Sequence, residues 1–380
     1  MKSKSLKFLY LSFFFGGLVL YAPVSLYLRT SRGITINEFF ILQIIFYLSI
    51  ALFEVPCGIV TDKIGYKKSI ILSALMILLA RSIFLVAHGF LLFTLEALIE
   101  GIGGCFASGT VSALLFEKVG DDKFSRSLAI LDNFGTAGFI LSTILFYFLY
   151  GGIKLEGLLV LTIISTLLNL ICCFFIPNGI ARNKHLKSKI DWKILTSRTF
   201  LILSAGDAVI GFGIILTNFF FVTKLNEVGI NAKYMSIIIL GYSAFQMLVP
   251  YILDILEKFN QNLIYKMLWF TMAILFIALA LIKNNILVLI IMLIIPLIVA
   301  IPGYFLALFQ NSVVDKRKSE EQRATVLSLF SMGQNFVTLL VLLIFSIIHI
   351  SNASVVFLIG GVIIGIYALI NLGIKFEEEH

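Results

Sequence analysis

The chain has 380 residues, of which 60% are hydrophobic and only 13% are charged. Soluble domains carry roughly 25% charged residues, and a soluble fold could not hide this much apolar surface from water. The composition therefore excludes an ordinary soluble protein and indicates an all-α membrane protein with many spans.

Apolar segments bounded by charge, glycine or proline recur along the whole chain. The first, 8–28, follows three lysines as a signal peptide would, but it is long enough to cross a bilayer and no cleavage site follows it. We therefore expect a retained span there. The segments are predicted at 8–28, 37–60, 69–88, 90–115, 127–150, 155–176, 199–223, 233–256, 263–282, 285–313, 324–348 and 352–374. They predict twelve transmembrane helices in two pseudo-symmetric six-helix bundles.

A polar stretch over 177–198 separates the two predicted bundles, 1–176 and 199–380. Its charges are too dense to bury, so we expect a cytoplasmic linker with room for a short interfacial helix near Trp192. The halves carry a faint repeat, because Glu54-x-x-x-Gly58-x-x-x-Asp62 matches Gln246-x-x-x-Pro250-x-x-x-Asp254. Such repetition is typical of transporters that rock one half against the other.

The distribution of Lys and Arg predicts the orientation. With both termini in the cytoplasm, 22 of the 29 basic residues lie inside and one, Arg81, lies within a span. The basic net charge of +8 is thus an insertion signal, and no nucleic-acid partner is expected. The six basic residues assigned to outer loops are Arg29, Arg32, Lys154, Lys224, Lys233 and Lys283.

The four cysteines indicate no cofactor or metal. Cys57, Cys105, Cys172 and Cys173 all lie inside apolar runs, with no metal-ligand spacing and no companion histidines. Small buried hydrophobic side chains are the expected role of these thiols.

One charged stretch interrupts the apolar runs after the second predicted span. Gly58 would let another helix approach closely, and Gly65 would permit a tight turn. Asp62 is placed to accept hydrogen bonds at a neighbouring helix N-terminus. Lys63 and Lys67 could pair with Glu117 or anchor to lipid headgroups, and Glu54 lies close enough to belong to the same group.

This stretch, Gly58-x-x-x-Asp62-Lys63-x-Gly65-Tyr66-Lys67, resembles the signature loop of the major facilitator superfamily, Gly-x-x-x-Asp-Arg/Lys-x-Gly-Arg-Arg/Lys. Its place between the second and third spans is the family's own, and Tyr66 departs from the usual Arg. The resemblance implies a twelve-span transporter of the drug-efflux type, in which this loop is a conformational latch between the two halves.

Ionisable groups inside the membrane are costly and mark candidate functional residues. Glu96 and Glu100 are one helical turn apart on one face, so they should not both ionise, and one is expected to hold a proton. Arg81 lies at a similar depth to Glu96 and is predicted to pair with it. In the family this region reads Arg-x-x-x-Gly, whereas Glu100 here stands in the Arg position before Gly104, which suggests a cationic or proton-coupled site.

Further polar side chains are predicted to line the same proton and substrate cavity. They lie on the fifth, seventh, eighth and eleventh predicted spans and are Asp132, Asp207, Asn218, Gln246 and Asn335. The two aspartates could equally be hydrogen-bonded between helices.

These features predict a proton-coupled exporter of small hydrophobic or cationic compounds, working by alternating access in a cytoplasmic membrane. The alternative is a proton-coupled importer of a specific metabolite. The antiporter signature of the family is absent from the fifth span, where only Gly135-x-x-Gly138 remains. No enzymatic activity is expected, and the protein is expected to function as a monomer with a small-molecule substrate, protons and lipid as partners.

Overall fold

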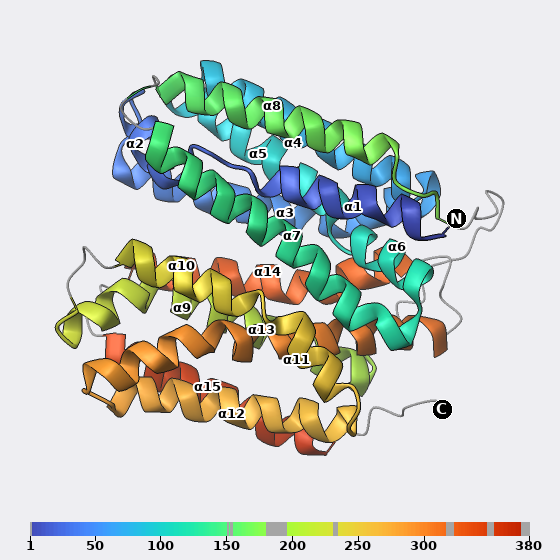
Figure 1. Cartoon of the computed structure of the whole chain (residues 1–380), viewed down its shortest axis with the longest axis vertical. Helices are drawn as coiled ribbons and strands as arrows, with labels where there is room; N and C mark the ends of the chain where they lie inside the picture. The colour runs from blue at the N-terminus through green and yellow to red at the C-terminus, as the bar shows by residue number, and fades with distance from the viewer. Residues whose placement is uncertain are drawn as a thin grey trace. The chain divides into compact units, whose positions relative to one another are not determined.

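The computed structural model describes residues 2–149, 152, 155–179, 196–230, 235–316, 323–347 and 353–373. These residues fold into helices, with no strand among them (Figure 1). The helices are α1 (Lys2–Gly17), the 3-10 helix η1 (Ala22–Val24), α2 (Ser25–Thr30), α3 (Ile36–Ile64), α4 (Tyr66–Val86), α5 (Gly89–Ala107), α6 (Thr110–Val119), α7 (Asp121–Leu149), α8 (Leu155–Phe174), α9 (Arg198–Glu227), α10 (Met235–Gln246), α11 (Val249–Leu256), α12 (Gln261–Leu281), α13 (Asn285–Lys316), α14 (Arg323–Ile347) and α15 (Ala353–Leu372).

The chain is an all-α membrane protein, as the composition predicted. Within the described ranges, nine helices are long and apolar enough to cross a membrane. Each of the twelve predicted spans coincides with one helix or with consecutive helices of this order. The predicted linker falls mostly on residues 180–195, including Trp192, which lie outside the described residues.

The chain forms two compact units that differ from the expected halves at two segments. Unit 1 comprises Met1–Gly120, Ile130–Lys189 and Val314–Leu329. Unit 2 comprises Asp121–Ala129, Ile190–Val313 and Phe330–His380. The start of α7 therefore belongs to unit 2 and the start of α14 to unit 1, so each unit holds a short segment from the other half of the sequence.

The first predicted span is interrupted. Helix α1 ends at Gly17, and the chain runs through a non-helical segment, Leu18–Tyr21, before η1 and α2. Helix α8 supplies hydrogen bonds to the freed backbone: the Ser165 hydroxyl donates to Leu18 O at 3.0 Å, and Leu20 N donates to the Thr162 hydroxyl at 3.1 Å. An interruption in a membrane-spanning helix is tolerated where other side chains bond to the freed backbone groups.

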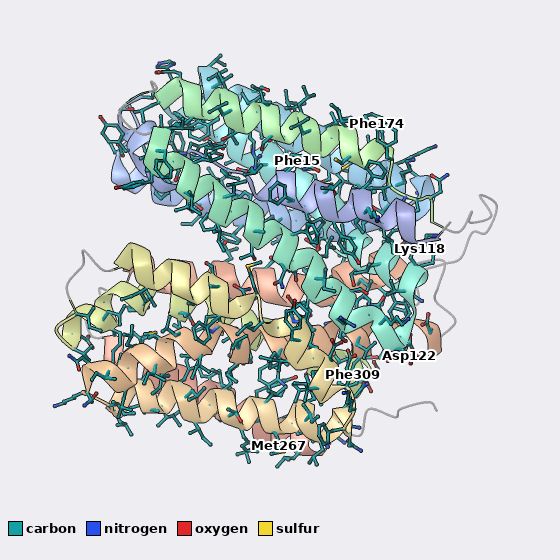
Figure 2. The ribbon with its side chains drawn as sticks, in the orientation of Figure 1. Phe15, Lys118, Asp122, Phe174, Met267 and Phe309 are labelled. Carbon is teal, nitrogen blue, oxygen red and sulfur yellow. The ribbon has the colours of Figure 1, made fainter. Side chains whose placement is uncertain are left out.

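Apolar side chains form the core of each unit. In unit 1, Tyr21 packs edge-on against Phe84, which in turn meets Phe93, and α1, α4, α5 and α8 lie side by side (Figure 1). In unit 2, α12 and α15 pack through the rings of Trp269 and Tyr367, whose centroids are 4.4 Å apart. Figure 2 shows Phe15 on α1, and its carbonyl accepts the Ser165 hydroxyl at 2.9 Å.

Candidate functional site

The charged loop singled out in the sequence joins α3 to α4. Gly65 between the two helices has φ 89° and ψ 154°, a conformation that residues with a side chain rarely adopt. Its N–H donates to Thr61 O at 2.8 Å, and the hydroxyls of Thr61 and Ser69 are 2.5 Å apart. The Ser69 hydroxyl also donates to Phe106 O of α5 at 3.0 Å. Gly65 therefore makes the turn, and hydroxyl groups anchor the loop to α5.

Asp62 caps the first turn of α14 within unit 1. Its carboxylate accepts hydrogen bonds from Ala324 N at 3.1 Å, from Thr325 N at 2.9 Å and from the Thr325 hydroxyl at 2.5 Å. The first N–H groups of a helix lack partners inside the helix, and negative charge is favourable at that end. The helix N-terminus that the sequence predicted beside Asp62 is present, while the role of this contact as a latch stays a prediction.

Gly58 lies where α3 passes closest to the same end of α14. A Cβ added at Gly58 would lie 2.9 Å from Ser328 Oγ and 3.0 Å from Thr325 Cα. One of these atoms is backbone, so the two helices could not keep this approach with a larger residue on α3.

The remaining loop residues differ in their surroundings. Lys63 is exposed and Lys67 is partly exposed, and neither forms an ion pair within the part of the chain that the structure describes. The partner observed for Glu117 is its neighbour Lys118, with Nζ and Oε1 2.9 Å apart. Glu54 is fully buried. Of the two roles left open for the lysines, pairing with Glu117 is not observed.

A repeat-related contact is present in unit 2. Arg126, in the first turns of α7, pairs with Asp254 of α11, with Nε and Oδ1 3.0 Å apart. Glu257, just beyond α11, is half-buried, and burial together with the charge of Asp254 raises its pKa to about 7, against a lowering effect of Arg126. This corner therefore combines a salt bridge with a carboxyl group that titrates near neutral pH.

The partner of Glu96 in unit 1 is Arg29 of α2. Arg29 Nη2 donates to both carboxylate oxygens of Glu96, at 2.9 and 3.2 Å. The guanidinium also stacks over Phe84, 4.3 Å from the ring centroid. Arg29 is only 8% exposed, so its assignment to an outer loop was wrong. The break after Gly17 explains the error, because it starts a new helix that carries Arg29 into the core.

Arg81 does not pair with Glu96, contrary to the prediction. Its Nη1 donates to the hydroxyl of Thr166 on α8. Arg81 is 8% exposed, its Nε has no hydrogen-bond partner, and no carboxylate lies within ion-pair distance of it among the described residues. Similar depth on consecutive helices did not bring the two groups together, because Arg29 already occupies Glu96.

Glu100 is the partly exposed member of the acidic pair. It lies one helical turn from Glu96 on α5, close enough to act on that carboxylate through its charge. Tyr21 completes the group, since Glu100, Arg81, Glu96 and Arg29 all act on it electrostatically.

Unit 2 holds a second polar contact at membrane depth. Gln310 Nε2 of α13 donates to Asp207 Oδ2 of α9 at 2.5 Å. The sequence did not single out Gln310. It directly follows Phe309, which Figure 2 labels. Of the two roles left open for Asp207, the hydrogen bond between helices is present.

The other candidate residues are placed as follows. Asp132 of α7 is partly buried, as are Gln246 at the end of α10 and Asn335 of α14. The side chain of Asn218 lies outside the described ones. These assignments to a cavity stay predictions.

Sequence reasoning missed Arg29 and the hydroxyl ladder of Thr162, Ser165 and Thr166. One signal was available: the Gly16-Gly17 pair and Pro23 fall inside the first apolar segment, and such residues often mark a broken helix. The ladder had no signal, because Ser and Thr on membrane helices commonly bond their own backbone.

Solved structures of transporters share this fold. The crystal structure of the E. coli fucose:proton symporter FucP has a TM-score of 0.74 at 13% identity and covers 97% of this chain and 99% of that chain. A structure of FucP in the outward conformation has a TM-score of 0.75. The human organic anion transporter MFSD10 (TETRAN) has a TM-score of 0.67 at 12% identity, with 97% and 99% of the two chains covered.

Sequence comparison extends the match from fold to family. No curated protein sequence matches the chain. The profile of the Major Facilitator Superfamily, however, matches residues 7–335, which is most of the chain and includes the signature loop and the acidic pair. The chain belongs to the Major Facilitator Superfamily of transporters.

Proposed function

We propose that the protein is a proton-coupled secondary transporter of small, largely hydrophobic compounds, with Glu96 and Glu100 as its proton-carrying pair. The observation that carries the proposal is the electrostatic coupling of these two carboxyl groups, which lie one turn apart on the apolar helix α5. Glu96 is held by Arg29, so Glu100 is the residue to which we assign proton transfer. Alternating access would expose it to each side in turn.

The direction of transport is the second part of the proposal. The sequence favoured export of hydrophobic or cationic compounds, with import by symport as the alternative. An acidic cavity wall was the argument for cations, and two arginines now accompany the two glutamates. This charge balance weakens the argument for cationic substrates. We propose symport because FucP, which shares the fold, has the printed name of a fucose:proton symporter.

The proposed location is supported by the family and by the charge distribution. We propose a cytoplasmic membrane of bacterial type with both termini in the cytoplasm, because basic residues concentrate in the loops on that side.

Glu100→Gln tests the proton role. Gln mimics the protonated state permanently, so substrate exchange between equal pools is expected to continue while accumulation driven by a pH gradient is abolished. Both are measured in proteoliposomes with a substrate found by thermal-shift screening. Glu156→Gln is the matched control, because that carboxylate lies in the same unit with 60% of its side chain exposed. Gradient-driven accumulation by Glu100→Gln at the wild-type rate would remove Glu100 from the mechanism and leave Asp207 as the next candidate.

A further inference from the structure

Arg81 is a buried cation with an unused hydrogen-bonding edge. Its guanidinium group is always charged, and it uses only Nη1, toward Thr166. Nε is buried without a partner, and Arg81 donates no other hydrogen bond within the described ranges. Nε and Nη2 form the side edge of a guanidinium, which binds a carboxylate through two parallel hydrogen bonds. That edge is free in Arg81.

Arg29 provides an internal comparison. It is buried to the same extent, 8% exposed, and its Nε also lacks a partner among the described residues, but both oxygens of Glu96 neutralise its charge through Nη2. A buried charge without such a partner is strongly unfavourable. The fold supplies one arginine with a carboxylate in direct contact and leaves the second without one, so the second is open to direct contact with an anion from outside the chain.

Tyr21 adds a second free group at the same place. It lies at the end of the non-helical segment Leu18–Tyr21, is 6% exposed, and its hydroxyl makes no hydrogen bond to any described residue. Helix α8 links it to Arg81: Thr162 holds the segment through Leu20 N, and the Thr166 hydroxyl, which contacts Arg81, donates to Thr162 O at 2.8 Å. The Tyr21 ring also packs against Phe84, at 4.9 Å between centroids, one turn beyond Arg81 on α4.

The charges in this group are two arginines and two glutamates. Since Glu96 is committed to Arg29, the charge of Arg81 is balanced only by Glu100. When Glu100 carries a proton, one positive charge remains in excess, located on Arg81. An incoming anion would then restore neutrality in a region where net charge is costly.

From this arrangement we infer that the free edge of Arg81, with the hydroxyl of Tyr21, binds the carboxylate of a small organic acid. The inference rests on the proposed function and specifies its substrate class: a monocarboxylate whose remaining part is largely hydrophobic. Protonation of Glu100 and carboxylate binding support each other, so the proton and the organic acid move together.

The test is equilibrium binding without any ion gradient. Purified protein in detergent is heated with butyrate, octanoate, benzoate or phenylacetate, each compared with its uncharged amide. At least one carboxylate is expected to raise the unfolding temperature where its amide does not, and titration of that shift gives the affinity. Arg81→Gln is expected to lower the affinity at least about tenfold, since two charge-assisted hydrogen bonds are lost. Tyr21→Phe should lower it several-fold.

Two further variants separate binding from folding. Arg81→Lys keeps the charge but not the two-donor edge, so it should bind more weakly than wild type and more tightly than Arg81→Gln. Arg32→Gln is the matched arginine control, because Arg32 already donates to Phe84 O at 2.7 Å, and its affinity should equal that of wild type. Without ligand, Arg81→Gln should unfold no earlier than wild type, whereas an arginine with a purely structural role would lose stability.

Two outcomes overturn the inference: no carboxylate in the panel stabilises the protein more than its amide, or Arg81→Gln binds as tightly as wild type. Because no gradient is involved, failure of proton coupling gives a different result. A carboxylate that needs Arg81 for binding, yet accumulates on a pH gradient in Glu100→Gln, would support this site and contradict the proposed function.

Discussion

Asp62 and Asp254 stand at positions that the sequence predicts to be repeat-related, and their contacts in the structure differ. Asp62 accepts three hydrogen bonds from the first turn of α14. Asp254 forms one ion pair with Arg126, in which the two side chains are 34% and 48% exposed. Each contact holds the short segment that its unit takes from the other half of the sequence.

The difference shows that two matching positions in the sequence can form contacts of different strength. Each hydrogen bond from a helix N-terminus to a partly buried carboxylate contributes about 1.5–3 kcal/mol to stability. An exposed ion pair contributes roughly 0–1 kcal/mol. The residues four positions earlier also differ. Gly58 permits a close approach between helices, whereas Pro250 lies in the first turn of α11. We therefore expect the contact in unit 1 to matter more.

The largest expected effect is that of Asp62→Asn. The amide keeps one acceptor oxygen but presents an NH2 group to a backbone donor, so we expect a loss of about 2 kcal/mol in the stability of this contact. Transport in proteoliposomes should fall strongly while expression stays near normal. Transport at the wild-type rate would reduce the loop to a basic hairpin without a latch function.

Gly58→Ala should have the next largest effect. The added Cβ meets Thr325 Cα at 3.0 Å and Ala324 O at 3.2 Å, so α3 and α14 must separate, at a cost of about 1–2 kcal/mol. Thermal unfolding measures the loss. Gly104→Ala is the matched control on α5, because no atom lies within 4 Å of a Cβ there. Equal unfolding temperatures for the two variants would contradict the close approach.

Breaking the ion pair of unit 2 should matter less. Asp254→Asn and Arg126→Gln are each expected to reduce stability by less than about 1 kcal/mol, and the double variant should add little to either single change. A double-mutant cycle by thermal unfolding measures the coupling. If Asp254→Asn impaired transport as much as Asp62→Asn, the two repeat positions would be equivalent after all.

A pH dependence is expected at the same corner. The pKa of Glu257 is raised to about 7 by burial and by Asp254, above the ordinary value near 4.3. The folded state therefore holds the proton more tightly than the unfolded state, and its contribution is complete below about pH 4 and is lost as pH rises through about 7. Glu257→Gln should flatten this part of the stability profile. Identical profiles for variant and wild type would place the titration elsewhere.

Local sequence was sufficient for the fold class and for the loop. Apolar runs of bilayer length predict helices because each helix satisfies its own backbone hydrogen bonds in lipid, and every predicted span has its helix. Gly65 and Asp62 were recognisable because a turn with positive φ and a free helix N-terminus each favour few residue types. The acidic pair stays a prediction, made because Glu96 and Glu100 are one turn apart on one helix.

The partners of the charged groups depend on the tertiary structure alone. Depth along a helix can be counted in the sequence, and on that basis Arg81 was matched with Glu96. The rotation of each helix, however, depends on packing between distant segments, and the interruption after Gly17 brings Arg29 to Glu96 instead. The same interruption leaves Arg81 with only a hydroxyl from α8. Sequence by itself thus identified Arg81, Glu96 and Glu100 as charges within apolar helices but not Arg29. The tertiary structure decided which of them are neutralised, because ion pairing requires contact in three dimensions and not only equal depth.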